Sequence, residues 1–290
     1  GESGIYGLMM ESRYHSFSRG INSRMLFPKT EFERGIRMGR KAFVCEGDSW
    51  FENKSRLKSI PYVLRTNRLG GRAPYTNLNY ASGGDWARDV AENLDRSLDA
   101  LSKYSRHQLN FALSAGGNDL LDQANLERIL IENPRGDFDA IDPEGFAAFG
   151  HELSDSVLSI FRRVNETSPG IPIFWNGYDY PVASNIGIRF FLFQLAGPWI
   201  YQPLHDKGYH SVDEKRDVVR QIVDAFFSLQ EEIVLEFRDE GGLVHLVDLR
   251  GVVQDEADWG DEIHPSSQAI VELSRAYRAQ VDEFARYPVA

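Results

Sequence analysis

Residues 41–49 read Lys-Ala-Phe-Val-Cys-Glu-Gly-Asp-Ser, so a short apolar run passes directly into a turn of small and polar residues. A run of this length that stops at a turn is typical of a strand buried on both faces of a parallel sheet. Similar short runs recur along the chain. We therefore predict strands at 41–46, 76–80, 108–114, 171–176 and 243–248.

Long stretches of helical periodicity separate these strands. Apolar residues recur at helical spacing from Trp86 to Leu101 and again from Phe146 to Val164. The second of these helices is expected to begin at Asp142-Pro143 and to end before Gly170, since proline suits a first helical turn and glycine a helix end. Strands that alternate with helices in this way are typical of a parallel sheet built from βαβ units.

Two more helices are predicted near the carboxyl end of the chain. Ser211 with Glu214 has the spacing of a capping box, which predicts a helix from there to Gly241-Gly242. The segment 268–286 is predicted to form the last helix. Because no 20- to 50-residue period recurs and no low-complexity linker divides the chain, we expect one doubly wound α/β domain over 41–290.

Composition limits the possible functions. The 290 residues are 42% hydrophobic and 12% aromatic, enough for a large buried core. A net charge of −11 disfavours a nucleic-acid partner, since phosphate binding needs clustered Lys and Arg. We find no apolar segment of about 18 residues that could span a bilayer. The chain is expected to be soluble, either cytoplasmic or secreted after loss of a signal, and its oligomeric state is left open.

The first 40 residues differ from the remainder. Residues 1–41 carry eight Lys or Arg against four Glu, in contrast to the acidic remainder. We interpret 1–40 as an N-terminal extension that is partly disordered. The lone Cys45 rules out an intrachain disulfide, and its apolar surroundings indicate a buried residue.

Three residues have the chemistry of acyl transfer through a serine. A serine hydroxyl becomes a nucleophile when a base takes its proton and a third group orients that base. Ser49 follows the first predicted strand, and Asp261 lies three positions before His264, so that one turn brings its carboxylate to the imidazole. We predict Ser49 as the nucleophile, His264 as the base and Asp261 as its orienting acid.

Donors for an oxyanion are expected on the loops after three strands. Gly84 offers a backbone N–H just before a predicted helix, where an anion is favoured. Asn118 offers a side-chain amide in Gly116-Gly117-Asn118-Asp119, and the N–H of Ser49 completes the set. Gly83 is left open as an alternative to Gly84.

An aromatic-rich segment lies between the fourth and fifth predicted strands. Residues 178–210 contain eight aromatic residues in 33, about double the average of the chain. We interpret this insertion either as a cover over the strand ends that forms a substrate pocket or as a satellite core beneath a long loop. Substrate contacts are expected from Asp48, Trp50, Tyr178, Phe191 and Trp199.

The four blocks Gly47-Asp48-Ser49, Gly84, Gly116 to Asp119 and Asp261 to Pro265 resemble those of the SGNH hydrolases, also called the GDSL lipase and esterase family. The resemblance covers roughly residues 41 to 285. It implies a flavodoxin-like three-layer sandwich with a five-stranded parallel sheet, and it implies the roles given above for Ser49, Gly84, Asn118, Asp261 and His264. Trp50 stands where the family commonly has leucine, which reshapes the wall beside the serine.

The sequence thus favours a serine ester hydrolase that needs no cofactor and no metal. Its substrate would be a carboxylic ester, such as a short-chain ester, a lipid or an O-acetylated sugar. Two alternatives are a metal-dependent phosphoesterase, because Gly-Asp and Gly-Asn-Asp fragments also occur in two-metal sites, and a non-catalytic binding module on the same fold. Neither a His-Glu-x-x-His motif nor a cysteine cluster is present, so the other histidines are expected to be structural or exposed.

Overall fold

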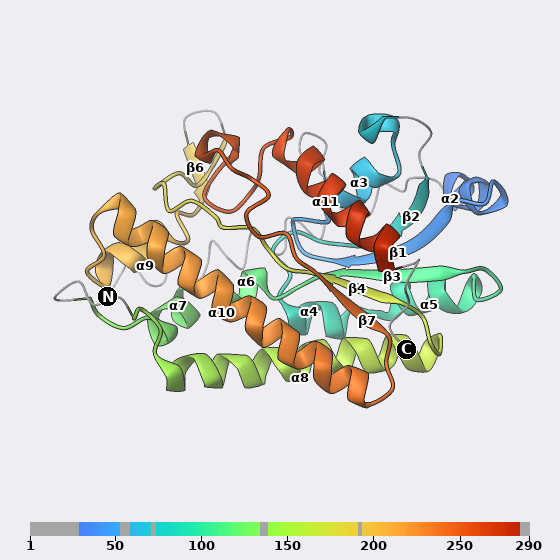
Figure 1. The fold of residues 1–290 in the computed structure, drawn as a ribbon, viewed down its shortest axis with the longest axis horizontal. Helices are drawn as coiled ribbons and strands as arrows, with labels where there is room; N and C mark the ends of the chain where they lie inside the picture. The colour runs from blue at the N-terminus through green and yellow to red at the C-terminus, as the bar shows by residue number, and fades with distance from the viewer. Residues whose placement is uncertain (1–28, 53–58, 71–73, 134–138, 191–192, 285–290) are drawn as a thin grey trace.

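The computed structural model describes residues 29–52, 59–70, 74–133, 139–190 and 193–284. Its centre is a sheet of five parallel strands in the order β2-β1-β3-β4-β7 (Figure 1). The strands are β1 Lys41–Gly47, β2 Tyr75–Asn79, β3 Leu109–Ser114, β4 Ile173–Asn176 and β7 Val244–Val247. Each lies within two residues of its predicted bounds, and the predicted α/β fold class is confirmed.

This strand order has a switch point between β1 and β3. From β1 the chain first moves outward to β2 and then returns to the other side of β1, where β3, β4 and β7 follow in sequence. In open α/β sheets, ligands bind beyond the carboxyl ends of the strands at such a point. A functional site is therefore expected at the loops after β1 and β3.

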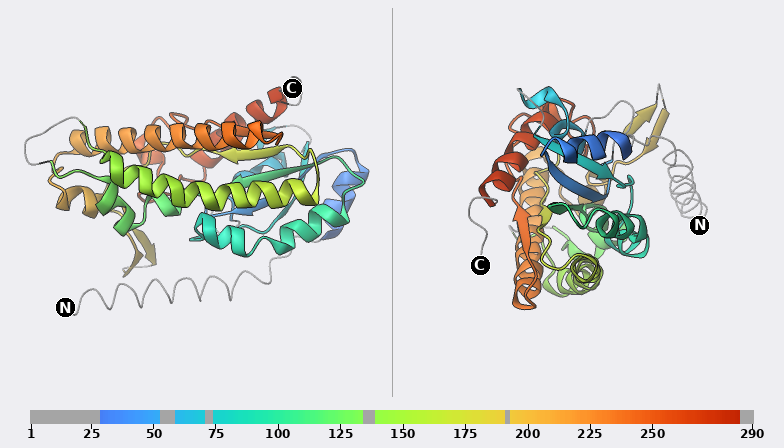
Figure 2. Two further views of the ribbon diagram at one scale, coloured as in Figure 1. Left: turned by 90° about the horizontal axis from the view of Figure 1, so that it is seen from below. Right: turned by 90° about the vertical axis from the view of Figure 1, so that its right-hand side faces the viewer.

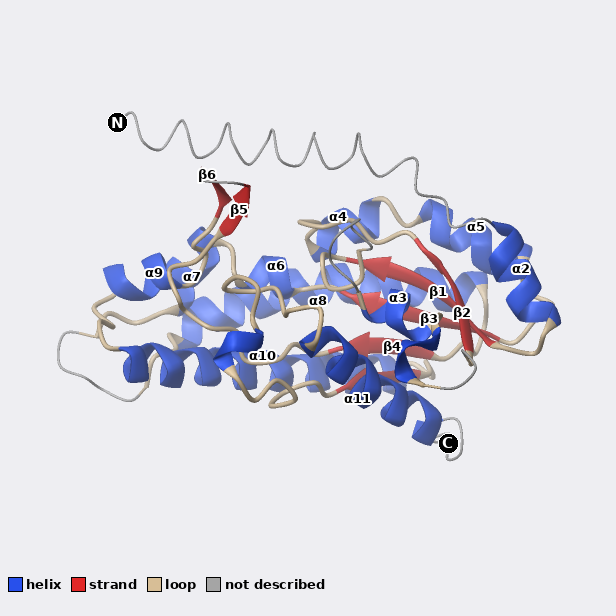
Figure 3. Cartoon of the chain, turned by 90° about the horizontal axis from the view of Figure 1, so that it is seen from above, coloured by secondary structure: helices blue, strands red, loops and turns tan. Residues whose placement is uncertain are grey.

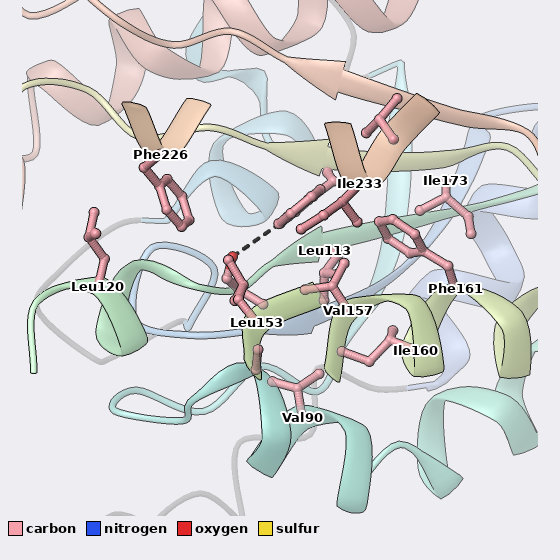
Figure 4. Close-up of a cluster of buried hydrophobic side chains, with 14 of the residues drawn as sticks. Val90, Leu113, Leu120, Leu153, Val157, Ile160, Phe161, Ile173, Phe226 and Ile233 are labelled. Carbon is pink, nitrogen blue, oxygen red and sulfur yellow. Dashed lines mark hydrogen bonds between the residues drawn. The ribbon is translucent and has the colours of Figure 1, made fainter. Parts of the chain in front are cut away.

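Helices cover both faces of the sheet. One face is covered by α3 Ile60–Leu64 and α11 Ala269–Phe284, and the other by α4 Ala87–Glu92, α5 Asp95–Lys103, α8 Pro143–Thr167 and α10 Val212–Asp239. Neighbouring strand residues alternate between the two layers, so that Val44 packs with the second group of helices and Cys45 with the first. Figure 4 shows Leu153 and Val157 of α8 beside Leu113 of β3 in the larger core.

Two helices extend well past the sheet. With 25 and 28 residues, α8 and α10 span about 38 and 42 Å, whereas a strand of four to seven residues spans about 13 to 23 Å. The extra length lies beyond the carboxyl ends of the strands (Figure 2). Figure 3 shows that half of the molecule with α6 Gly117–Leu120, α7 Gln123–Ile129, α9 Tyr201–Asp206 and the antiparallel pair β5 Ile188–Phe190 and β6 Phe193–Ala196.

The ends of the long helices follow the sequence signals. The Ser211 hydroxyl accepts a hydrogen bond from the Glu214 N–H at 3.1 Å, and the Glu214 carboxylate accepts one from the Ser211 N–H at 2.8 Å. This is the predicted capping box, which satisfies two N–H groups that have no partner within the helix. At the start of α8 the carboxylate of Asp142 accepts a bond from Gly145 N at 2.7 Å.

The periodic stretch from Trp86 to Leu101, predicted as one helix, forms two. The break falls at Asn93 and Leu94, between α4 and α5. At the end of α4 the Asp89 carbonyl accepts hydrogen bonds from both the Asn93 N–H at 3.0 Å and the Asn93 side chain at 2.7 Å. Leu94 is fully buried at the turn, which keeps the apolar spacing intact across the break.

A helix also lies in the stretch expected to be an extension. α2, Lys29–Arg37, packs on the sheet edge through Phe32, whose ring meets Tyr104 edge to face at 5.1 Å. A Cβ at Gly35 would lie 2.5 Å from the Thr76 side chain, so that α2 approaches β2 closely. Residues 1–28 lie outside the described residues.

Short 3-10 turns at Asn67–Leu69 and Glu256–Asp258 complete the elements. None of the described helices combines the length and apolar character needed to cross a membrane.

Candidate active site

The loops after β1, β2 and β3 are bound to one another at the carboxyl end of the sheet. Asp48 N donates to the Ser114 carbonyl at 2.9 Å, and Ser82 N donates to the Gly47 carbonyl at 2.8 Å. These bonds continue the sheet pairing past the ends of the strands. Three of the four sequence blocks therefore meet at one place.

Glycine at position 47 is required by the close approach of two strands. Its φ is +134°, and a Cβ there would lie 2.0 Å from the carbonyl oxygen of Ser114. No side chain fits at that distance. The tight turn that follows presents Ser49 at the strand end, where it is half-buried.

The side chains of Ser49, His264 and Asp261 form a continuous hydrogen-bonded chain. His264 Nε2 lies 2.9 Å from Ser49 Oγ, and His264 Nδ1 lies 2.8 Å from an oxygen of Asp261. Only 14% of the His264 side chain and 9% of the Asp261 side chain are exposed. The arrangement can take a proton from the serine and hold the resulting imidazolium against a buried carboxylate.

Asp261 also holds the backbone of its own turn. One carboxylate oxygen accepts hydrogen bonds from the N–H groups of Ile263 at 2.9 Å and His264 at 2.8 Å. Burial alone would raise the pKa of Asp261, but the hydrogen bond and charge of His264 and these two N–H groups outweigh it and lower the pKa below its usual value. The carboxylate is thus stabilised in the charged form that orients an imidazole.

Two of the three residues expected to supply oxyanion donors lie on connected segments: Gly84 on the loop after β2, and Asn118 in the short helix α6 after β3. Asn118 Nδ2 donates to the Asp85 carbonyl at 2.9 Å, which joins α6 to the loop of Gly84. A second bond, from Ala87 N to Asp119 Oδ2 at 2.9 Å, joins α6 to the start of α4. Gly84 has φ +87°, a conformation that favours glycine.

Gly84 is better placed than its neighbour to meet a substrate. Gly83 is buried, whereas Gly84 is half-buried like Ser49.

Asp119, directly after Asn118, is buried between α6 and the start of α4, and that burial raises its pKa to about 7. The hydrogen bond that the Asp119 carboxylate accepts from Ala87 N anchors the first turn of α4.

Asp48 faces inward, whereas the sequence led us to expect it to contact the substrate. It is 2% exposed and accepts hydrogen bonds from Ser114 Oγ at 2.6 Å, from Trp50 N at 3.0 Å and from the hydroxyl of Tyr178. Burial raises its pKa. We therefore assign Asp48 to holding the turn of Ser49 rather than to contacting a substrate.

Trp50 and Tyr178 lie beneath the turn. Trp50 is 5% exposed, and its Nε1 donates to the Ile263 carbonyl at 3.2 Å. The ring of Tyr178 meets that of Trp50 edge to face at 5.1 Å. Trp50 thus joins the loop of Ser49 to the loop of His264, and a leucine there would have no side-chain N–H to make this bond.

Of the other expected substrate contacts, Trp199 lies beside the histidine. Its ring centre is 6.1 Å from that of His264, with the two planes at 82°. Trp199 is half-buried, so part of its surface is accessible. Phe191 lies outside the described residues.

Glu262 is a residue of the site that no sequence motif indicated. This residue has no exposed surface, and its carboxylate accepts hydrogen bonds from four backbone N–H groups, those of Asn185, Trp199, Ile200 and Tyr201. Burial raises its pKa, although the N–H groups act in the opposite direction. The only signal in the sequence was a second acidic residue next to Asp261.

No three His, Cys, Asp or Glu side chains gather as a metal site would require within the described ranges. His205 and His210 lie close together on the surface, with their Nδ1 atoms 3.2 Å apart. His245 is half-buried against Phe174 and Phe284. These histidines lie outside the chain of contacts around Ser49.

The fold of this chain is similar to those of several solved structures, at low sequence identity. A family 3 carbohydrate esterase from Clostridium thermocellum matches 87% of this chain and all of its own length, with a TM-score of 0.51 and 14% sequence identity. A GDSL-like lipase from Parabacteroides merdae matches 84% of this chain and 97% of its own, with a TM-score of 0.47 and 14% identity. The chain shares the fold of the carbohydrate esterase.

An extracellular lipase from Streptomyces rimosus matches 83% of this chain and 99% of its own, with a TM-score of 0.47 and 13% identity. No family model matches the sequence, and no curated protein matches it. The four blocks that carry the SGNH resemblance all lie at the carboxyl end of the sheet or on the loop before α11.

Proposed function

We propose that this chain is a serine ester hydrolase in which Ser49 is the nucleophile, His264 the general base and Asp261 the residue that orients the base. The observation that carries the proposal is the pair of contacts from His264, at 2.9 Å to Ser49 Oγ and at 2.8 Å to Asp261. Hydrogen-bond distance between nucleophile and base, and between base and orienting acid, is the geometric requirement of this chemistry.

The proposed reaction has two stages. Ser49 Oγ attacks the carbonyl carbon of the ester while its proton passes to His264 Nε2. The tetrahedral intermediate then collapses, the bond to the alcohol oxygen breaks, and His264 returns the proton to the departing alcohol. In the second stage a water molecule attacks the acyl-serine with His264 as base, which releases the carboxylic acid and restores Ser49.

We assign the oxyanion donors to the N–H groups of Gly84 and Ser49 and to the Asn118 amide. Two features support this assignment. The Asn118 amide is held by Asp85, so that its orientation is set before a substrate binds. The buried link from Asp119 to Ala87 fixes the same two loops relative to each other. Donors that need no reorganisation are the effective ones in a transition state.

The substrate class we propose is a carboxylic ester. The matching structures are described as a carbohydrate esterase and as lipases, and short-chain esters, lipids and O-acetylated sugars all contain the bond to be cleaved. Turnover of p-nitrophenyl esters with acyl chains of graded length, compared with release of acetate from acetylated xylan, distinguishes these three substrates.

The test of the proposed activity is turnover of p-nitrophenyl acetate by the wild-type protein and by Ser49→Ala. We expect the variant to lose activity by several orders of magnitude and the wild-type rate to be unaffected by a chelator. Equal turnover by both proteins would overturn the proposal. Loss of wild-type turnover in chelator would instead support a metal-dependent hydrolase, and chelator-sensitive turnover of p-nitrophenyl phosphate would identify a phosphoesterase. Tight ester binding without turnover would support a binding module.

A further inference from the structure

Glu262 binds a distant segment of the chain to the loop of His264. Its Oε1 accepts from the N–H groups of Asn185 at 3.3 Å and Tyr201 at 3.0 Å, and its Oε2 accepts from those of Trp199 and of Ile200 at 3.0 Å. A carboxylate with no exposed surface that receives four N–H groups is a strong anchor, because removing it leaves those donors buried and unsatisfied.

The backbone of Glu262 is held as well. Its N–H donates to the Ile186 carbonyl at 3.0 Å, and its own carbonyl accepts from Val182 N at 3.1 Å. Asp261 precedes it, and the N–H groups of Ile263 and His264 bind Asp261. Residues 182–186 and 199–201 are therefore fixed to the turn that carries the proposed base.

Trp199 is the aromatic side chain that this anchor places beside the base. Its N–H is bound to Glu262, and its ring lies over Gly197, where an added Cβ would be 2.8 Å from ring atoms. The ring stands nearly perpendicular to that of His264 at 6.1 Å and is half-buried. The backbone and the ring of Trp199 are thus both positioned, and part of the residue is left accessible.

We propose that Trp199 forms a subsite for the alcohol part of the ester, and that Glu262 is the positioning residue that holds it there. This inference rests on the proposed esterase function. In that function, His264 Nε2 gives its proton to the departing alcohol oxygen, so a group next to the imidazole meets the alcohol side of the substrate. An indole face favours flat rings and the C–H face of sugars, which predicts esters of ring-bearing alcohols as substrates.

The first test compares acetate esters that share an acyl group and differ in the alcohol. Ethyl acetate has a small alcohol, phenyl acetate an aryl ring and methyl 2-O-acetyl-β-xyloside a sugar ring. For Trp199→Ala we expect kcat/KM to fall about tenfold for the ring esters, mainly through a higher KM, and less than about twofold for ethyl acetate. A fall confined to phenyl acetate or to the xyloside identifies which ring the subsite takes.

Glu262→Gln tests the positioning role. Glutamine replaces one acceptor oxygen with an NH₂ group, which would face two N–H donors. We expect the same selective rise in KM as for Trp199→Ala, and no further loss when both changes are combined, since Glu262 acts through Trp199. Trp199→Phe, which keeps an aromatic face, should restore part of the preference for ring esters.

Asp179→Asn is the matched control. Asp179 is also a buried carboxylate bound to backbone N–H groups, those of Tyr180, Gly251 and Val253, but it does not bind the segment of Trp199. We expect it to lower stability without changing the ratio of kcat/KM between ring esters and ethyl acetate. An equal change in that ratio in the control would overturn the assignment to Glu262.

Covalent labelling by a fluorophosphonate separates failure of the subsite from failure of the function. If Ser49 is labelled in the wild-type protein and in Trp199→Ala, and the three esters are affected equally, the subsite is wrong while the esterase function stands. Absence of labelling at Ser49 in the wild-type protein would overturn the function and the subsite together. Should Glu262→Gln fail to fold, Trp199→Ala still decides the subsite, since its backbone N–H remains available to Glu262.

Discussion

The Nε2 atom of His264 and the Oγ atom of Ser49 lie 2.9 Å apart although the two residues are 215 positions apart in the chain. β7, which precedes the loop of His264, lies three positions from β1 in the sheet, about 14 Å away. The loop must therefore cross the ends of β4 and β3. Hydrogen bonds from Gly251 and Val253 to Asp179 and from the segment at Trp199 to Glu262 hold it on that path.

Asp261→Asn should abolish most activity without removing the serine. The amide cannot hold a protonated Nδ1 as the carboxylate does, so the imidazole takes the wrong tautomer for a base. We expect kcat to fall about 10³- to 10⁴-fold. Steady-state kinetics with p-nitrophenyl acetate, beside circular dichroism to verify folding, measures this. A folded variant that loses less than about tenfold would remove Asp261 from the mechanism.

Asn118→Ala should lower kcat and leave KM nearly unchanged. The amide is proposed to bind the oxyanion, whose charge develops only in the transition state, so its loss should cost about 10²- to 10³-fold in kcat. The measurement is a full kinetic comparison with the wild-type protein on one ester. A rise in KM at constant kcat would instead indicate a role in substrate binding.

Glu46→Gln should change how stability depends on pH. Burial raises the pKa of Glu46 from 4.5 to about 7, although hydrogen bonds from Ser97 and Gly47 N oppose the shift. As pH rises from about 4.5 to 7, the unfolded chain releases this proton before the folded one, so the free energy of unfolding falls.

Glutamine is neutral at every pH, so the variant lacks the pH-dependent contribution of Glu46 to the free energy of unfolding, which is on the order of 3 kcal/mol. Urea unfolding of both proteins at pH 5 and pH 8 provides the measurement. We expect the free energy of unfolding to fall less between pH 5 and pH 8 in the variant than in the wild-type protein. The decrease that remains is assigned to Asp119, whose pKa is also raised to about 7. Identical declines in the two proteins would contradict the assignment.

Ser211→Ala should destabilise the protein and spare its activity. The change removes the hydroxyl that accepts a hydrogen bond from the Glu214 N–H at the start of α10. We expect the free energy of unfolding to fall by about 1 kcal/mol and the melting temperature by about 2–4 °C. Ser228→Ala, an exposed change in the middle of the same helix, serves as the control and should be neutral or slightly stabilising. Equal effects of the two changes would argue against the cap.

The strands and the long helices were predictable because their signals are local. Buried parallel strands appear as apolar runs, and capping residues such as Asp142 and Ser211 mark helix starts within a few positions. The break between α4 and α5 was missed because the apolar spacing continues across Asn93 and Leu94.

The chain of Ser49, His264 and Asp261 was expected because each residue lies in a short motif of fixed spacing. The surroundings were harder to predict. Asp48 and Glu262 are acidic residues that the sequence places beside reactive ones, and only the fold shows that both face inward onto hydrogen-bond donors. The donors for Glu262 come from residues 61 to 77 positions away, a relationship without any local pattern.

The proposal depends most directly on a reactive hydroxyl at Ser49, and a fluorophosphonate probe followed by peptide mass spectrometry measures it. We predict that the wild-type protein is labelled at Ser49, that His264→Ala lowers the labelling rate by several orders of magnitude, and that Ser49→Ala is not labelled. Labelling at another residue, or an equal rate in wild-type protein and His264→Ala, would contradict the account.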